Sequence, residues 1–188
     1  MAKISSPYAV PDKHVALMGR VADTWAQLEF QIDQGIWYLA GPEQQLIACI
    51  TAQLISVHPR LRAFTALVAI RGGSEQSVRD LNTFTGNVSG LSDQRNRTVH
   101  DPRFVDKATG EVHRLEITAR PKVQFGFLPE PASQLEERIT RISERVFEFI
   151  ELRDRIISEI DGLPPESQPI LQRIVPVPQA PQDRPTGE

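Results

Sequence analysis

The sequence is poor in the features that mark secreted, membrane-spanning and cysteine-ligated metal proteins. Cys49 is its only cysteine, which excludes an internal disulfide and a cysteine-based zinc site. No apolar run approaches the roughly 18 residues that a membrane-spanning helix needs. Residues 1–7 lack the apolar core of a signal peptide. We therefore expect an intracellular, cytoplasmic protein that contacts no membrane.

Several familiar catalytic and nucleotide-binding patterns are also absent. Gly72-Gly73 is not followed by the Lys-Ser/Thr of a phosphate-binding loop, and no serine stands in a nucleophile elbow. His14, His58 and His113 have no carboxylate or histidine neighbour at metal-ligand spacing, so we expect all three on the surface or in loops. The sequence accordingly predicts neither a metal nor a cofactor.

The composition is that of one ordinary globular domain. Its 188 residues are 40% hydrophobic and 24% charged, and a net charge of −3 gives no general case for nucleic-acid binding. The charge is uneven, however. Residues 58–107 hold eight Lys and Arg against five Asp and Glu, whereas the remainder holds thirteen against nineteen. Either the middle of the chain is the basic part of an acidic protein, or the charges are scattered at random.

Hydrophobic periodicity predicts five helices. Apolar residues recur every three or four positions over residues 12–39, 42–57, 58–71, 75–100 and 133–161. The first helix should turn Val15 and Trp25 inward, and the second is apolar over a wide arc, which predicts a central position. Ser74 is expected to cap the fourth helix, and Ser133-Gln134-Leu135-Glu136 to form a capping box at the fifth. Gly86 and Gly90 predict a kink or a break within the fourth helix.

Between the fourth and the last helix the period changes to two. Alternating residues on either side of a turn at 107–110 predict a β-hairpin, and 123–127 a third short strand. Residues 1–11 are typical of a flexible arm, and 162–188, with seven of the fifteen prolines, of a disordered tail. The predicted fold is thus an all-α bundle of about five helices over residues 12–161, with a small β-hairpin insertion at about 103–127 before the last long helix.

Residues 91–102 form the one stretch in which core packing does not explain the positions of the polar side chains. The apolar stripe of the fourth helix runs on through Arg95 to Val99, so an arginine stands where a leucine is expected. A charged group on such a stripe is rarely tolerated unless it is paired or lines a cleft. His100 follows about 140° further round the helix, and Pro102 should end the helix near it. Two copies facing each other across a two-fold axis could bring both side chains into one cleft.

Two interpretations of this pair are open. As structural residues, Arg95 would form an ion pair with Glu29, which points inward from the first helix, and His100 would cap the helix terminus. As chemical groups, an arginine and a histidine suffice to cleave RNA without a metal. The histidine exchanges protons with the ribose 2′-hydroxyl or the leaving 5′-oxygen, and the arginine stabilises the charged transition state.

The segment Arg95-Asn96-Arg97-Thr98-Val99-His100 resembles the Arg-x4–6-His signature of the HEPN superfamily (higher eukaryotes and prokaryotes nucleotide-binding domains). The order of elements over residues 12–160 is similar too, from a long first helix carrying Trp25-Ala26-Gln27-Leu28-Glu29 to an insertion before a long last helix. The resemblance implies a helical homodimer with the motif in a cleft between protomers. It implies Arg95 and His100 as the catalytic pair and Asn96 as the residue that orients them. One departure is Asp101-Pro102 directly after the motif, where similar sequences commonly have a small residue.

Three functions follow from these observations. The first is a HEPN-like metal-independent ribonuclease, a toxin or defence effector with RNA as substrate and an antitoxin as partner, in which Arg97 and Arg103 bind the substrate. The second is a catalytically inactive HEPN-like dimer that binds a partner protein or a nucleotide. The third is an unrelated helical protein whose Pro-rich tail recruits a partner.

Overall fold

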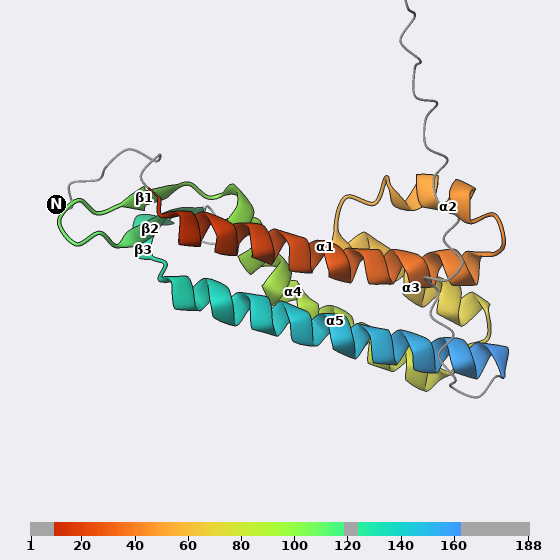
Figure 1. The fold of residues 1–188 in the computed structure, drawn as a ribbon. Coiled ribbons are helices and arrows are strands. Elements are labelled where there is room, and N and C mark those ends of the chain that lie inside the picture. The colour runs from red at the N-terminus through yellow and green to blue at the C-terminus, as the bar shows by residue number, and fades with distance from the viewer. Residues whose placement is uncertain (1–9, 119–123, 163–188) are drawn as a thin grey trace, which may run out of the picture.

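The structure is a computed structural model that describes residues 10–118 and 124–162. Figure 1 shows long helices packed side by side with a small sheet at one end. In chain order the elements are α1 (Asp12–Ala40), α2 (Gln44–Thr51), α3 (Val57–Ile70), α4 (Glu75–His100), β1 (Arg103–Val105), β2 (Val112–Thr118), β3 (Gln124–Pro129) and α5 (Ala132–Asp161). The predicted helical bundle with a small β-insertion before the last helix is confirmed. The arm at residues 1–9 and the tail at 163–188 lie outside the described residues.

Four helices, α1, α3, α4 and α5, enclose one apolar core. Lys13 forms an ion pair with Glu136 near the start of α1, and Tyr38 donates a hydrogen bond to Asp161 near its end. The first of these contacts joins the N-terminal ends of α1 and α5, and the second joins their C-terminal ends. The two helices therefore run parallel. α4 runs in the opposite direction (Figure 1), so its last residues lie beside the first turns of α5.

The inward face of α1 follows the predicted stripe over most of its length. Trp25 is 2% exposed and Ile32 is fully buried. The first turns differ, because Val15 is 54% exposed while His14 points inward. The physical reason is that this end of α1 meets Glu130 and charged residues of the sheet, so a polar side chain takes the inward position.

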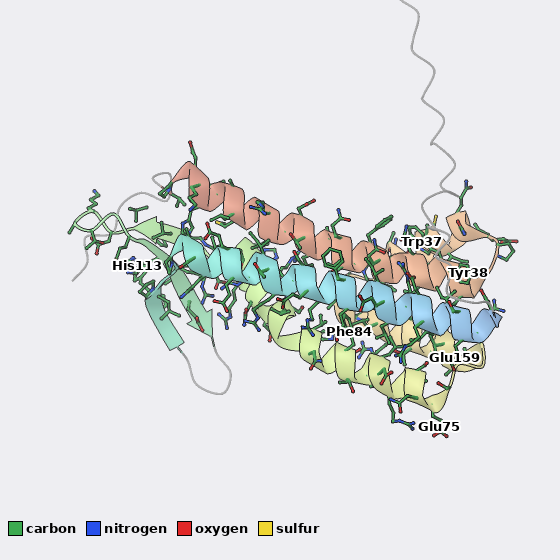
Figure 2. All side chains as sticks on the ribbon, turned by 60° about the horizontal axis from the view of Figure 1, so that its bottom comes forward. Trp37, Tyr38, Glu75, Phe84, His113 and Glu159 are labelled. Atoms are coloured by element: carbon green, nitrogen blue, oxygen red, sulfur yellow. The ribbon has the colours of Figure 1, made fainter. Side chains whose placement is uncertain are left out.

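α2 is peripheral, and the prediction of a central second helix over 42–57 is wrong. Leu46 and Ile50 are 62% and 65% exposed, and Cys49 is exposed as well. The helix has only eight residues, and Thr51 is the one it buries. The Trp37 indole N–H donates to the Thr51 hydroxyl at 2.9 Å, which fixes α2 to the outer side of α1. Figure 2 shows Trp37 at this end of the bundle.

α4 begins and ends where the sequence predicts. The Ser74 hydroxyl accepts a hydrogen bond from the Ser77 amide at 3.2 Å, a side-chain cap that satisfies one free helix donor. The helix is continuous from Glu75 to His100, so a break at Gly86 or Gly90 is wrong, whereas the alternative of a kink stays a prediction. One glycine costs a helix about 1 kcal/mol, which the buried side chains of the same helix offset.

α5 begins one residue earlier than predicted, and the capping box is wrong. Pro131 precedes the helix with φ −66°, and the helix starts at Ala132 without a side-chain cap. Ser133 and Glu136 therefore lie inside the first turns, where Glu136 is free to pair with Lys13. Proline favours a helix start because its fixed φ suits the first turn.

The three strands form an antiparallel sheet in the order β1-β2-β3. The register opposes Phe104 to His113, Leu115 to Phe127 and Ile117 to Phe125. Opposed residues of an antiparallel pair point to the same face of the sheet. One side of the sheet, here called the outer face, is therefore apolar apart from one histidine, and it consists of Phe104, His113, Leu115, Ile117, Phe125 and Phe127.

The opposite side, here called the inner face, is charged. It carries Arg103, Arg114 and Glu116 beside the apolar Val112 and Leu128, and it is turned toward the ends of α4 and α5. The main apolar core contains no residue of the sheet. Outward, Ile117 is 61% and Phe125 70% exposed. The usual arrangement of an antiparallel sheet on a domain, apolar side in and polar side out, is thus reversed here.

Candidate functional site

The last turns of α4 carry the motif and connect directly to β1. His100 is the last helical residue, and Asp101 is extended with ψ 137°, as expected for a residue before proline. The Asp101 amide still donates to the Arg97 carbonyl at 3.1 Å, which closes the final turn. The motif therefore lies where the helical bundle meets the sheet.

Arg95 is half-buried, in agreement with its place on the helical stripe. Its Nη1 donates to the Asn96 Oδ1 at 3.1 Å. Its Nε is buried and has no hydrogen-bond partner among the described residues, and the structure records no ion pair for this guanidinium there. Within the part of the chain that the structure describes, Asn96 is therefore the one side chain that holds the head of Arg95.

His100 is exposed at the end of α4. It lies four residues after Asn96, so these two side chains leave the helix only about 40° apart. Arg95 leaves it on another side, but its hydrogen bond to Asn96 draws the guanidinium toward the side that Asn96 and His100 share. Asn96 and His100 thus share one side of α4, and Arg95 is linked to Asn96. No hydrogen bond or ion pair joins Arg95 to His100 among the described residues.

Arg97 and Asp101 belong to a network of ion pairs with the inner face of the sheet. Arg97 lies 3.4 Å from a Glu116 carboxylate oxygen and 3.7 Å from Asp101. Arg114 binds Asp101 at 2.7 Å and Glu116 at 2.9 Å. The negative charge that follows the motif at Asp101 is therefore balanced by two guanidinium groups.

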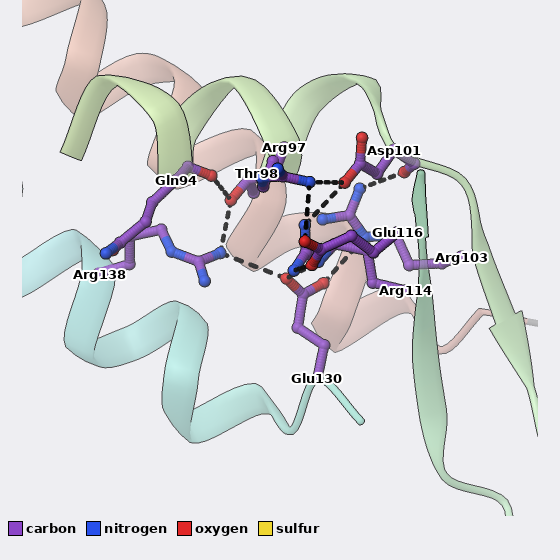
Figure 3. Close-up of polar contacts among 9 residues, drawn as sticks. All are labelled: Gln94, Arg97, Thr98, Asp101, Arg103, Arg114, Glu116, Glu130 and Arg138. Atoms are coloured by element: carbon purple, nitrogen blue, oxygen red, sulfur yellow. Dashed lines mark hydrogen bonds and ion pairs between the residues drawn. The ribbon is translucent and has the colours of Figure 1, made fainter. Parts of the chain in front are cut away.

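Glu130 lies at the centre of this network (Figure 3). Its carboxylate, 2% exposed, accepts from Arg103 Nε at 2.9 Å and from Arg138 Nη1 at 3.3 Å, with Arg114 Nε at 3.7 Å. Arg138 also donates to the Thr98 hydroxyl at 2.5 Å. A single buried carboxylate thus joins α4, the sheet and α5.

Arg97 and Arg103, the two arginines predicted to bind substrate, differ in burial and in their partners. Arg103 is 5% exposed and donates to Glu130 and to the Asp101 carbonyl, while its Nη2 is buried without a partner among the described residues. Its predicted role in binding substrate stays a prediction that this burial does not favour. Arg97 is half-buried and already paired with two carboxylates. Of the carboxylates that bind these two arginines, Asp101 is a local neighbour of Arg97 on α4. Glu116 on β2 and Glu130 between β3 and α5 are distant along the chain, so no local pattern predicts their pairing.

Glu29 is not brought to Arg95. Its Oε1 accepts a hydrogen bond from the Trp25 indole N–H at 3.1 Å, one turn earlier on α1. The motif end of α4 faces the start of α1, near His14, and Glu29 lies fifteen residues further on, about 22 Å along the helix. The predicted ion pair between Glu29 and Arg95 is therefore not formed.

His14 was predicted on the surface and is instead 5% exposed. Desolvation lowers the pKa of its imidazole, and the positive charges of Arg103 and Lys13 act in the same direction, while Glu130 raises it. The Nε2 atom of His14 is buried without a described partner. His14 is thus a neutral residue of the charged junction, and no neighbouring residue in the sequence signals it.

The comparisons with known proteins add no relative. No family model, no curated protein and no solved structure matches this chain. Within residues 10–118 and 124–162, no helix is long and apolar enough to cross a membrane. The same part of the chain has no cluster of three or more His, Cys, Asp or Glu that could hold a metal ion.

Proposed function

We propose that this chain is a HEPN-like, metal-independent ribonuclease that acts as a homodimer, with Arg95, Asn96 and His100 at the cleft between two α4 helices. The observation that carries the proposal is the state of the motif arginine. Arg97, Arg103, Arg114 and Arg138 all have carboxylate partners, whereas among residues 10–118 and 124–162 Arg95 donates only to the Asn96 amide oxygen. A guanidinium that no carboxylate neutralises keeps its charge for a phosphate.

Each residue then has one task in the proposed reaction. The His100 imidazole takes the proton of the ribose 2′-hydroxyl, or protonates the leaving 5′-oxygen. The 2′-oxygen attacks the phosphorus, the bond to the 5′-oxygen breaks, and a 2′,3′-cyclic phosphate and a free 5′-hydroxyl result. The Arg95 guanidinium stabilises the added negative charge on the phosphoryl oxygens. Asn96 holds Arg95 toward His100 and is a positioning residue.

A second candidate is the catalytically inactive HEPN-like dimer that binds a partner protein. The pairing of the neighbouring arginines favours it, because proteins that bind nucleic acid usually contact several phosphates with unpaired Lys and Arg. One free guanidinium gives little affinity for a phosphate backbone. The two candidates therefore differ in what they predict for RNA cleavage.

The test is cleavage of mixed RNA in EDTA by the parent protein, Arg95→Ala and His100→Ala. We expect cleavage by the parent with 2′,3′-cyclic phosphate ends and a loss of at least about 100-fold in either variant, as for removal of a general acid–base. Asn96→Ala should lower the rate less than the other two substitutions, because it removes only the group that positions Arg95.

Matched controls are Arg79→Ala, an exposed arginine on the same helix, and His113→Ala on the sheet. Both should cleave like the parent. Equal cleavage by His100→Ala and the parent would indicate a contaminating nuclease, and no cleavage by a correctly folded parent would favour the inactive dimer.

A further inference from the structure

Strand β3 is an edge strand that lacks the usual protection of sheet edges. Among the described residues no strand pairs with its outer edge. Natural proteins commonly blunt such edges with charged side chains, bulges or very short strands. Residues 124–129, Gln-Phe-Gly-Phe-Leu-Pro, carry no charge, and proline occurs only at the last position. β1, at the opposite edge, is only three residues long. The open edge of the sheet is therefore β3.

The side chains around this edge are apolar on both faces. Phe125 is 70%, Phe127 38% and Leu128 44% exposed, and Ile117 on the neighbouring strand is 61% exposed. Figure 2 shows the strands extending away from the helices, so no helix covers the edge in this part of the chain. An exposed, uncharged and apolar edge strand is a template for another strand.

The hydrogen-bond pattern identifies the free backbone groups. The Glu130 amide donates to the Val112 carbonyl at 2.9 Å, so the residues that bond to β2 are the even-numbered ones, including Gly126 opposite Glu116. The N–H and C=O groups of Phe125 and Phe127 then point outward along the open edge.

We propose that β3 pairs antiparallel with β3 of a second copy of this chain, centred on Gly126. In this register Phe125 of each copy opposes Phe127 of the other. The two outward-pointing residues exchange both backbone hydrogen bonds, four in all across the two-fold axis. Gly126 of one copy lies opposite Gly126 of the other, and these two residues form no hydrogen bonds with each other. The two sheets become one sheet of six strands, with four phenylalanine rings in adjacent rows on its outer face.

Charge and area favour a second copy as the occupant and set the strength of the contact. The strand has no charge, so two copies meet without repulsion, and the Phe-Gly-Phe pattern is symmetric about its centre. With ~200 Å² for a free phenylalanine side chain, the apolar groups at the edge expose about 400 Å² per copy. Even if all of this area were covered, the pair would bury about 800 Å², below the roughly 1,200 Å² of stable specific complexes and in the range of weak, transient ones. The proposed β3 contact is therefore weak and depends on concentration. It is separate from the α4 interface of the proposed function, so the two contacts together would join α4 dimers into larger assemblies.

The test is a disulfide between two copies. Gly126→Cys, in a Cys49→Ser background, places the two sulfur-bearing residues opposite each other with Cα atoms about 4.5 Å apart, a separation that a disulfide can bridge. A Cβ at Gly126 meets no atom within 4 Å, so the substitution fits the fold. Mild oxidation should give a covalent dimer. Leu128→Cys in the same background is the control, since its copies would lie about 13 Å apart in this register.

Sedimentation of the protein without added cysteines gives an independent measurement. Phe125→Lys and Phe127→Lys should weaken the β3 contact at least tenfold, whereas Phe147→Lys, an equally drastic change at a 66% exposed phenylalanine on α5, should leave it unchanged. The proposal is overturned if Gly126→Cys fails to cross-link, or if Leu128→Cys cross-links as readily. The former result would leave the edge to a different strand, such as residues 1–9 of the same chain.

Discussion

Gly35 on α1 lies directly against the ring of Phe64 on α3. A Cβ at Gly35 would lie 2.8 Å from the Phe64 ring, closer than real contacts allow. The ring is fully buried and packs edge-on against Phe149 with centroids 5.6 Å apart, so it cannot move aside. Glycine is needed at this position for space.

Gly35→Ala should therefore destabilise the protein by about 1–3 kcal/mol, the usual cost of overpacking a core. Gly19→Ala is the control on the same helix, because a Cβ there meets no atom within 4 Å. It should stabilise the protein by up to about 1 kcal/mol through helix propensity. Urea unfolding of both variants checks the pair, and equal shifts would mean that α1 and α3 pack less closely than described.

The burial of a residue could be predicted from the sequence when the contacts that bury it follow a local pattern. Trp25 lies mid-stripe, so periodicity within one helix sufficed to predict its burial. His14 and Arg103 are buried and interact with Glu130, which follows β3 in the sequence. No local pattern encodes such a long-range pairing. The sequence showed Arg95 as an unusual charge on an apolar stripe. It did not predict the hydrogen bond from Arg95 to Asn96.

At the scale of elements, the junction between α4, the sheet and α5 depends on Glu130. Replacing it with Gln leaves the buried Arg103 without a counter-charge. We expect Glu130→Gln to cost about 3–5 kcal/mol of unfolding free energy. Glu116→Gln, on the same network but more exposed, should cost only about 1 kcal/mol or less.

Chemical denaturation of the two variants measures this difference. A double variant, Arg103→Met with Glu130→Leu, should recover part of the stability that Glu130→Gln loses, because it removes the buried guanidinium together with its carboxylate. Arg114 and Arg138 also lose Glu130 in this variant but keep Glu116 and Thr98 as partners. If Glu130→Gln unfolds like the parent protein, the carboxylate is not the group that joins the three elements.

The elements themselves were largely predictable, and their faces were not. Alternation predicted the hairpin, and Gly110 with φ 73° provides its turn. Alternation shows that a sheet has one apolar face, but the direction of that face depends on what the helices present. Here the ends of α4 and α5 present charged side chains, so the charged face of the sheet turns inward. The amphipathic pattern of α2 likewise could not reveal that α1 and α3 already fill the core.

At the scale of the whole molecule, two parts are held together in different ways. The helices share an apolar core, whereas the sheet joins them mainly through ion pairs and lies outside that core. Regions with few buried apolar contacts open at lower free energy than the global unfolding reaction. Hydrogen exchange should therefore show lower opening free energies for amides of β2 and β3 than for the middle of α1 and α5. Equal protection in both parts would mean that they unfold as a single unit.

The single exposed thiol of Cys49 gives this architecture a practical consequence. α2 lies at the end of the bundle opposite the sheet (Figure 1), and α1 spans about 43 Å between the two ends. One spin label or fluorophore per chain can be attached there without any substitution, far from the motif and from β3. The distance between two such labels in a dimer reports directly whether the copies meet through their sheets, which places the labels at the far ends of the assembly, or side by side along their helices.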